Sequence, residues 1–493
     1  MTDIQVDMFE VQLGAALLIQ MRDSAGKSVR LLADAGINAP SPYARDHVAN
    51  KLPQALSTFA HSGESRIDLM VGTHYDQDHL AGLIDVTKQF PVGEALLPPV
   101  RTPAVRRDQM QEAADTNDLV APLELDALPP PADEEPSTDT LNSLAEYCQA
   151  VEHAAAQRLD FIVGLVRGRQ SSETVDRFLK EVDAYVDDLE ESVDEFDPDE
   201  PHGVGSYLAA STLDADLSTA AKQVAAIKKS AIMGAIVARW LNQLVTALKK
   251  NGVPIKSLTI PHGVPEYYEW DGTHRKFKPV SAAIYAASKE PKFTLLGPSK
   301  TLVNHHATKI PLGMYLVLGG HILKRPVRPS NQLSYVLLVE SGGQQILITG
   351  DSGCVDFYDR ISKGYFPALV SALKEPNVVQ IAHHAGSNAH FYDALLASNF
   401  ARSSAPAAFL MLSHGYHDQI RPTVEFKQFV TLLSSKRSNF CLLFTSEPQL
   451  SKVSSFTSRI HGLVGTSSKR NVGDVRLSYN ARSWTVDHHC VMP

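Results

Sequence analysis

The chain has 493 residues, of which 44% are apolar and 20% are charged, and its formal net charge is −9. This length predicts one elaborated domain or two domains, and the composition is typical of a globular protein. The acidic balance argues against a surface that is basic throughout and coats nucleic acid, although a local basic groove is compatible with it.

Three features of the sequence indicate the cellular compartment in which the protein resides. The four cysteines are scattered without a CxxC pair, as is typical of free thiols rather than of a disulfide framework or a cysteine zinc site. The N-terminal residues include acids and show no signal-peptide pattern. The longest apolar helical run, 230–250, contains Arg239, Asn242 and Gln243 and is too polar to span a bilayer. We therefore expect a cytoplasmic protein without a membrane partner.

The first hundred residues predict an α/β arrangement. Short apolar runs over 5–22, 28–36 and 66–74 predict strands. Helical spacing over 44–63 and 79–90 predicts helices, and the first of these ends at a glycine.

The character of the chain changes over 101–250. Residues 123–140 are acidic and rich in proline, which predicts a loop or linker, and 140–168, 172–196 and 214–252 have helical patterns. We expect a mainly helical, acidic insertion that offers a surface for a possible protein partner.

Short apolar runs alternate with polar clusters from 252 to the end of the chain. The segment 336–350 predicts a hairpin that turns at Gly342-Gly343. Several of the other runs pass directly into histidine or aspartate, which is where α/β proteins collect functional residues.

The segment "VGTHYDQDHLAG" (71–82) places four metal-binding side chain types within six residues, directly after a predicted strand. They are His74, Asp76, Asp78 and His79. Imidazole nitrogens and carboxylate oxygens are the ligands of zinc, manganese and iron, and the two pairs suit two ions side by side. The alternative is a polar loop in which Asp78 caps the following helix.

Two later segments have the same form of an apolar run that ends in a ligand type. Asp351 follows "ILITG" and is placed to bridge two ions, while His383 and His384 follow "VVQIA". Taken alone, Asp351 could be a turn residue and the histidine pair could be capped or buried.

These segments together resemble the metallo-β-lactamase fold. "HYDQDHLAG" resembles the HxDxDHxGG variant of its signature, and "LLADAG" looks like the strand that precedes it. The segments "SNQLSYVLLVESGGQQILITGDSG", "IAHHAGSNAH" and "FLMLSHGYHDQIRPTVEFKQFV" are similar, in order, to the hydrolase domain of ComEC-type DNA-uptake proteins. The resemblance covers about 5–100 and 250–490.

The resemblance implies an αββα sandwich whose halves are 1–100 and 251–493, interrupted by the 101–250 insertion. It also implies two bound divalent metal ions, zinc or alternatively manganese. The implied ligands are His74, Asp76, Asp78, His79, Asp351 and one of His383 and His384. Two departures from the family are the lack of its Gly-Gln-Gly-Asp turn in "QLGAALLIQ" and the presence of Arg421-Pro422 where the family has His-Pro.

Two bound ions acidify a bridging water and polarise the bond to be cleaved. Asp78 is a candidate to orient or deprotonate that water, or only a ligand. The candidates to protonate the leaving group are His383, His384, His414 and His417.

The expected function is a phosphodiesterase or nuclease acting on DNA or RNA. Arg421, the pair Lys436-Arg437 and the pair Lys469-Arg470 are candidates to hold phosphates, or are solvated loop charges. The alternatives are a hydrolase of a small ester, thioester or amide, and a module regulated by a protein bound to the insertion.

Overall fold

The computed structural model describes most of the chain outside the predicted insertion. The described residues are 3–37, 44–59, 65–99, 138–168, 171–180, 238–306, 329–352, 354–359, 364–386, 388–415, 418–461, 473–480 and 482–490. The chain divides into two compact units. The first comprises Met1–Pro99, Gln243–Val303 and Asn331–Pro493, and the second comprises Val100–Asn242 and Asn304–Ser330.

The first unit is a mixed α/β structure built on two eight-stranded sheets. The strand order of one sheet is β18-β17-β1-β2-β3-β4-β5-β6, and that of the other is β16-β15-β14-β11-β10-β9-β7-β8. The first sheet consists of β1 (Ile4–Met8), β2 (Leu17–Arg22), β3 (Ser28–Ala33), β4 (Ile67–Val71), β5 (Val92–Leu96), β6 (Ile255–Lys256), β17 (Gly473–Asn480) and β18 (Ser483–Cys490). The second consists of β7 (Glu266–Asp271), β8 (Lys276–Val280), β9 (Lys292–Gly297), β10 (Val336–Ser341), β11 (Gln344–Ile348), β14 (Val378–Gln380), β15 (Ala408–Leu412) and β16 (Phe440–Phe444). A small ribbon pairs β12 (Tyr358–Asp359) with β13 (Gly364–Tyr365).

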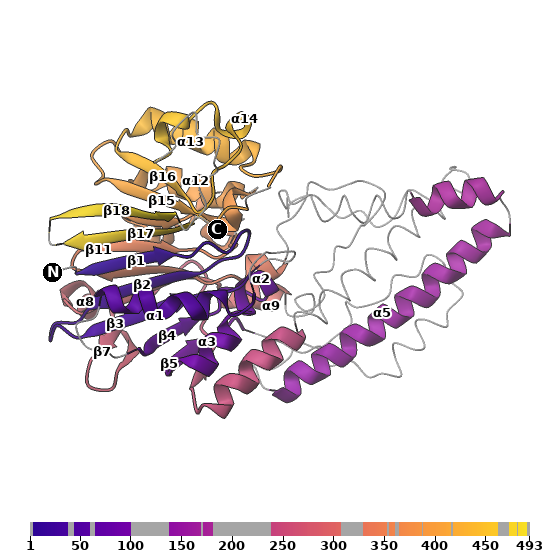
Figure 1. Ribbon diagram of the computed structural model, residues 1–493, viewed down its shortest axis with the longest axis horizontal. Helices are drawn as coiled ribbons and strands as arrows, with labels where there is room; N and C mark the ends of the chain where they lie inside the picture. Colours follow the sequence, from indigo (N-terminus) through magenta and orange to yellow (C-terminus); the bar gives the residue numbers. More distant parts are fainter. Residues whose placement is uncertain are drawn as a thin grey trace. The chain divides into compact units, whose positions relative to one another are not determined.

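The helices of this unit are mostly short and follow the strands. They are α1 (His47–Phe59), α2 (Gln77–Leu80), α3 (Leu83–Gln89), α8 (Ala282–Ala287), α9 (Lys300–His306), α10 (Pro329–Gln332), α11 (Pro367–Ala372), α12 (Ala389–Ala397), α13 (Val424–Lys436) and α14 (Leu450–Val453). In Figure 1, α1 and α3 lie along one side of the stacked strands, and α12 and α13 lie on the opposite side.

Alternating side chains explain why a sheet such as the first is covered on both faces. In β1, Ile4, Val6 and Met8 belong to the hydrophobic core that both sheets share. Gln5 points to the other face, where its Nε2 lies 3.3 Å from the carbonyl oxygen of Ala55 in α1. One face of the strand therefore packs against the opposite sheet and the other against a helix.

Parallel strands adjoin each other within both sheets. β3, β4 and β5 are parallel, and so are β11, β14, β15 and β16. Because the carboxyl ends of parallel strands meet at the same edge, the residues that follow them come together.

The predicted elements of this unit agree in type with the observed ones. The hairpin over 336–350 is confirmed as β10 and β11, and the helix expected over 79–90 is split into α2 and α3. Cys354 and Cys441 are free thiols, as expected.

The second unit is described over 138–168, which includes α5 (Thr138–Arg167), and over 171–180, 238–242, 304–306 and 329–330. Residues 172–180 and 238–242 are also helical. The helix over 172–180 and α5 share a small apolar cluster that includes Ile162, Val166 and Phe178. Most of the predicted insertion, including 123–137 of the predicted acidic loop, lies outside the described residues, and the last three loop positions, 138–140, begin α5 instead. Among the helices that the structure describes, none combines the length and the apolar character needed to cross a membrane.

Candidate metal centre

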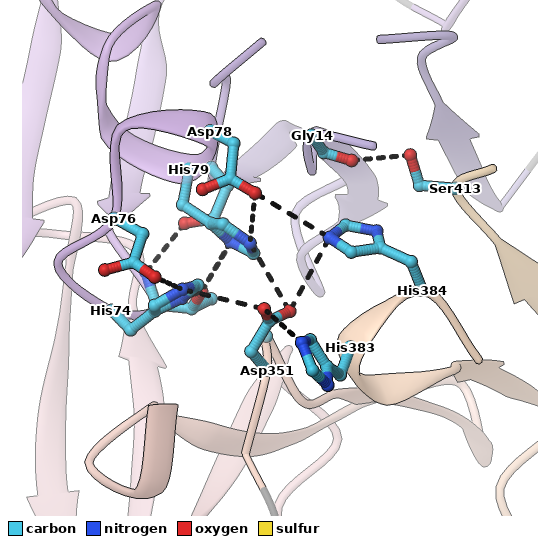
Figure 2. Close-up of polar contacts among 12 residues, drawn as sticks. Gly14, His74, Asp76, Asp78, His79, Asp351, His383, His384 and Ser413 are labelled. Carbon is cyan, nitrogen blue, oxygen red and sulfur yellow. Dashed lines mark hydrogen bonds and ion pairs between the residues drawn. The ribbon is translucent and has the colours of Figure 1, made fainter. Parts of the chain in front are cut away.

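Side chains of the predicted ligand types converge at the carboxyl ends of three strands. The segment with His74 and His79 follows β4, Asp351 follows β11, and His383 and His384 follow β14. The two sheets are joined here by a hydrogen bond of 2.8 Å from the backbone nitrogen of Tyr335 to the carbonyl oxygen of Thr73. Figure 2 shows the resulting cluster, in which Asp351 occupies the middle.

One group of side chains surrounds the Oδ2 atom of Asp351. The Nε2 atom of His74 lies 3.8 Å from it and 3.7 Å from Asp76 Oδ2. His383 Nε2 lies 4.0 Å from the same Asp351 oxygen. We call these four residues group 1.

A second group surrounds the other oxygen of the same carboxylate. Asp351 Oδ1 lies 3.4 Å from His79 Nε2 and 3.8 Å from His384 Nε2. Asp78 Oδ2 lies 3.9 Å from each of these two histidine nitrogens. We call these four residues group 2, so that Asp351 belongs to both groups.

Three sets of these residues have atoms close enough together to hold a metal ion: His74, His79 and Asp351; Asp78, His79 and His384; and His74, Asp76 and Asp78. His383 belongs to none of these sets. Ligands about 2.1 Å from a tetrahedral ion lie about 3.4 Å from one another, close to the separations observed here. The Nε2 atoms of His74, His79 and His384 and the Oδ1 atom of Asp351 are buried and make no hydrogen bond to the described residues. Buried polar atoms are normally satisfied, so lone pairs left without a donor at one point indicate a place for a cation.

Asp34 and Thr73 position His79, and sequence reasoning missed both. Asp34 Oδ2 lies 2.7 Å from His79 Nδ1, and the hydroxyl of Thr73 donates to the same oxygen at 2.6 Å. Because a carboxylate only accepts, Nδ1 carries a proton, and in the neutral imidazole Nε2 then presents its lone pair to group 2. The signal in the sequence was an aspartate at the end of the strand that precedes the histidine motif.

The turn after β14 explains how two adjacent histidines reach the same carboxylate. His383, His384 and Ala385 all have left-handed backbone conformations, with φ of 51°, 54° and 64°. Each such residue costs about 1–2 kcal/mol, so the surrounding structure must hold the turn in place. Sequence spacing could not choose between His383 and His384, and the structure places them at different oxygens of Asp351.

Close backbone packing fixes the segment that carries group 2. A Cβ atom added at Gly36 would lie 2.0 Å from the carbonyl carbon of Asp78 and 2.2 Å from the backbone nitrogen of His79. The carbonyl oxygen of His79 accepts a hydrogen bond of 3.0 Å from the backbone nitrogen of Ala35. Position 36 therefore requires glycine for steric reasons.

The turn that carries Asp351 is held by a buried glutamine. Gln380 Oε1 accepts hydrogen bonds from the backbone nitrogens of Thr349, at 3.0 Å, and Gly350, at 3.3 Å. Gly350 has φ of +52°, and a Cβ there would lie 2.4 Å from the hydroxyl of Thr73. These contacts set the direction in which the shared carboxylate leaves its strand.

Burial and the close approach of charged side chains shift the pKa values of several residues in the cluster. Burial, together with the carboxylates of Asp76 and Asp351, raises the pKa of Asp78 to about 6. Burial alone would lower the pKa of His79, but Asp34 and the other nearby carboxylates raise it well above its usual value. Burial would also raise the pKa of Asp351, but the surrounding histidines hold it well below its usual value.

Of the four predicted proton donors, His414 is described but is not part of group 1 or group 2. His414 is buried between Ser446, whose Oγ lies 3.1 Å from Nδ1, and the carbonyl oxygen of Arg421, 3.4 Å from Nε2. Burial lowers the pKa of His414. His417 lies outside the described residues, and the role of His414 as a donor stays a prediction.

Two other interpretations of the sequence are wrong. Asp76, not Asp78, occupies the N-cap of α2, and its side chain makes no capping hydrogen bond. Arg437 does not hold a phosphate on the surface, because it is buried and its guanidinium donates to the carbonyl oxygen of Phe400 and the side chain of Asn439. Lys469 and Arg470 lie outside the described residues.

No family model matches the chain, and no curated protein matches it at a significant level. The interpretation of the centre therefore depends on its own residues.

Proposed function

We propose that this protein is a metal-dependent hydrolase of the metallo-β-lactamase type, with a dinuclear centre that cleaves phosphodiesters, in DNA or RNA. The resemblance of the sequence motifs supports the family. The two facing sheets with helices on their outer sides agree with the αββα arrangement that the resemblance implies.

The observation that carries the proposal is the position of Asp351. Each of its two carboxylate oxygens lies 3.4–4.0 Å from the Nε2 atoms of a different pair of histidines. A carboxylate that serves two ligand groups is the arrangement expected for a bridge between two ions. The mixed imidazole and carboxylate ligands suit zinc, and manganese is the alternative.

When bound, two such ions would supply a water molecule acidified toward neutral pH and positive charge beside the scissile group. The protein's own residues prepare this chemistry. Asp34 fixes the tautomer of His79, and Gln380 fixes the turn that carries Asp351. Asp78 is the candidate to orient the water or accept its proton, and His414 is the candidate to protonate the leaving oxygen.

The test is a set of hydrolysis assays on full-length protein. Single-stranded DNA, double-stranded DNA, RNA and bis-p-nitrophenyl phosphate would be incubated with and without zinc or manganese, and with p-nitrophenyl acetate as a neutral ester. We expect metal-dependent cleavage of a phosphodiester that a chelator removes and added metal restores. His79→Ala should abolish it, whereas His274→Ala, at an exposed histidine paired with Asp271, should not.

Two results would count against the proposal. Full activity in His79→Ala would show that the cluster is not the active site. Hydrolysis of the neutral ester without any phosphodiester cleavage would instead support a small-ester hydrolase.

A further inference from the structure

One basic residue lies on the loop that flanks the candidate metal centre. Arg421 belongs to the loop between β15 and α13, and this loop is tied to the turn that carries His384. The backbone nitrogen of Thr423 donates to the carbonyl oxygen of Ala385 at 3.1 Å, and its hydroxyl donates to the same oxygen at 3.2 Å. The carbonyl oxygen of Arg421 itself lies 3.4 Å from His414 Nε2.

The guanidinium of Arg421 is held in place from one side. Its Nη1 lies 3.3 Å from Asp418 Oδ2, while Asp418 Oδ1 accepts from the backbone nitrogens of Ile420 at 2.8 Å and Arg421 at 3.0 Å. The Asp418 side chain is only 3% exposed, so it forms a fixed support. A guanidinium has five N–H donors, and the Nε of Arg421 is buried without a hydrogen bond to the described residues.

The contacts of its loop place Arg421 on the His384 side of the candidate centre. Thr423, two residues after Arg421, donates twice to the carbonyl oxygen of Ala385, the residue that follows His384. The Nε of Arg421, which makes no hydrogen bond to the described residues, is a donor that an anion bound on this side can use.

We propose that Arg421 binds an anionic phosphate oxygen of the substrate beside His384, and so selects phosphodiesters over neutral esters. This inference rests on the proposed hydrolytic function and adds the group that recognises the substrate's charge. A planar guanidinium fixed by an aspartate can give two parallel hydrogen bonds to a phosphate, which lysine cannot. Of the other basic side chains predicted for this task and described, Arg437 is occupied by the protein's own oxygens, and Lys436 donates to the carbonyl oxygen of Leu396 at 3.3 Å.

The first experiment measures phosphate binding and does not need catalysis. Zinc-loaded full-length protein would be titrated with inorganic phosphate, and binding would be followed by calorimetry in the wild type, Arg421→Gln, Arg421→Lys and Arg402→Gln. Arg402 is an exposed arginine and serves as the matched control. We expect about 10- to 100-fold weaker binding for Arg421→Gln, as for a lost charged hydrogen bond, with Arg421→Lys intermediate and Arg402→Gln unchanged.

The second experiment separates substrate recognition from loop structure. With bis-p-nitrophenyl phosphate, Arg421→Gln should raise KM more than it lowers kcat, while hydrolysis of p-nitrophenyl acetate should be unchanged. Zinc content and the thermal unfolding midpoint of each variant would be measured on the same preparation. If Arg421→Gln loses zinc or stability, the kinetic constants of Arg421→Lys are compared with those of the wild type instead.

The outcomes distinguish this inference from the proposed function. Equal phosphate affinity in the wild type and the Arg421 variants would overturn it, and so would equal loss of activity on the charged and the neutral substrate. A wild type that binds phosphate through Arg421 without cleaving any phosphodiester would overturn the proposed function and leave the binding role of Arg421 established.

Discussion

Replacing Asp34 by asparagine should weaken metal binding without removing any proposed ligand. The carboxylate of Asp34 accepts from His79 Nδ1 at 2.7 Å and from the hydroxyl and backbone nitrogen of Thr73 at 2.6 and 2.7 Å. An asparagine at position 34 can still accept from the backbone nitrogen of Thr73 through its side-chain oxygen. Its NH2 group then faces two donors, the hydroxyl of Thr73 and Nδ1 of His79. His79 would have to move its proton to Nε2, the atom that faces group 2.

The expected magnitude follows from this change of tautomer. Loss of a carboxylate that orients a metal-binding histidine typically costs 10- to 100-fold in metal affinity, or about 1.4–2.7 kcal/mol. Zinc affinity would be measured by competition with a chromophoric chelator in Asp34→Asn and in Asp271→Asn. Asp271 accepts hydrogen bonds only within its own exposed turn in the described structure and should leave affinity unchanged. Unaltered zinc affinity in Asp34→Asn would refute the orienting role.

Three further substitutions test the surrounding structure. Gly36→Ala should displace the Asp78–His79 backbone and so lower both the zinc affinity and the unfolding midpoint. Gly164→Ala should lower neither, because there is open space around Gly164. Equal behaviour of the two variants would contradict the close packing at Gly36. Phe429→Ala should lower the free energy of unfolding by about 3–5 kcal/mol in urea titrations, because the ring of Phe429 is buried and stacked on that of Tyr392. A loss below about 1 kcal/mol would contradict this. Burial opposes ionisation of Glu340, but the hydrogen bond from Lys292 helps to lower the pKa of Glu340 in the folded protein. The stability that ionised Glu340 contributes is therefore present above the unfolded pKa of about 4.3, and it is lost as the pH falls through the lower folded pKa. Glu340→Gln should therefore lose less stability than the wild type between about pH 5 and 3 in urea titrations, and parallel curves would contradict it.

The local part of the site could be predicted from the sequence. His74 and His79 follow an apolar run within one short segment, and Asp351 ends another run. Strand ends of this kind are recognisable without tertiary information, because period and composition define the strand and its last residue.

The supporting residues could not be predicted because they depend on pairing between distant segments. Asp34 and Thr73 lie 39 positions apart and meet because β3 and β4 pair in parallel with Ala33 opposite Val71. The left-handed turn at His383 and His384 is equally hidden, since positive φ is uncommon outside glycine and no glycine marks these two positions.

Long-range contacts also explain the error at Arg437. Its position beside Lys436 suggested a basic surface loop. In the structure, its guanidinium instead donates to the carbonyl oxygen of Phe400, 37 positions earlier in the chain. A buried arginine that satisfies backbone oxygens cannot be told from an exposed one by sequence spacing.

The central claim is that one carboxylate joins two metal sites, and metal stoichiometry tests it directly. Full-length wild type, Asp351→Ala and Asp76→Ala would be loaded with zinc, separated from free metal by gel filtration and measured by elemental analysis. The dinuclear centre predicts about two zinc ions per chain in the wild type, about one in Asp76→Ala and close to none in Asp351→Ala. A wild type without zinc or manganese, or an Asp351→Ala variant that keeps two ions, would contradict the account.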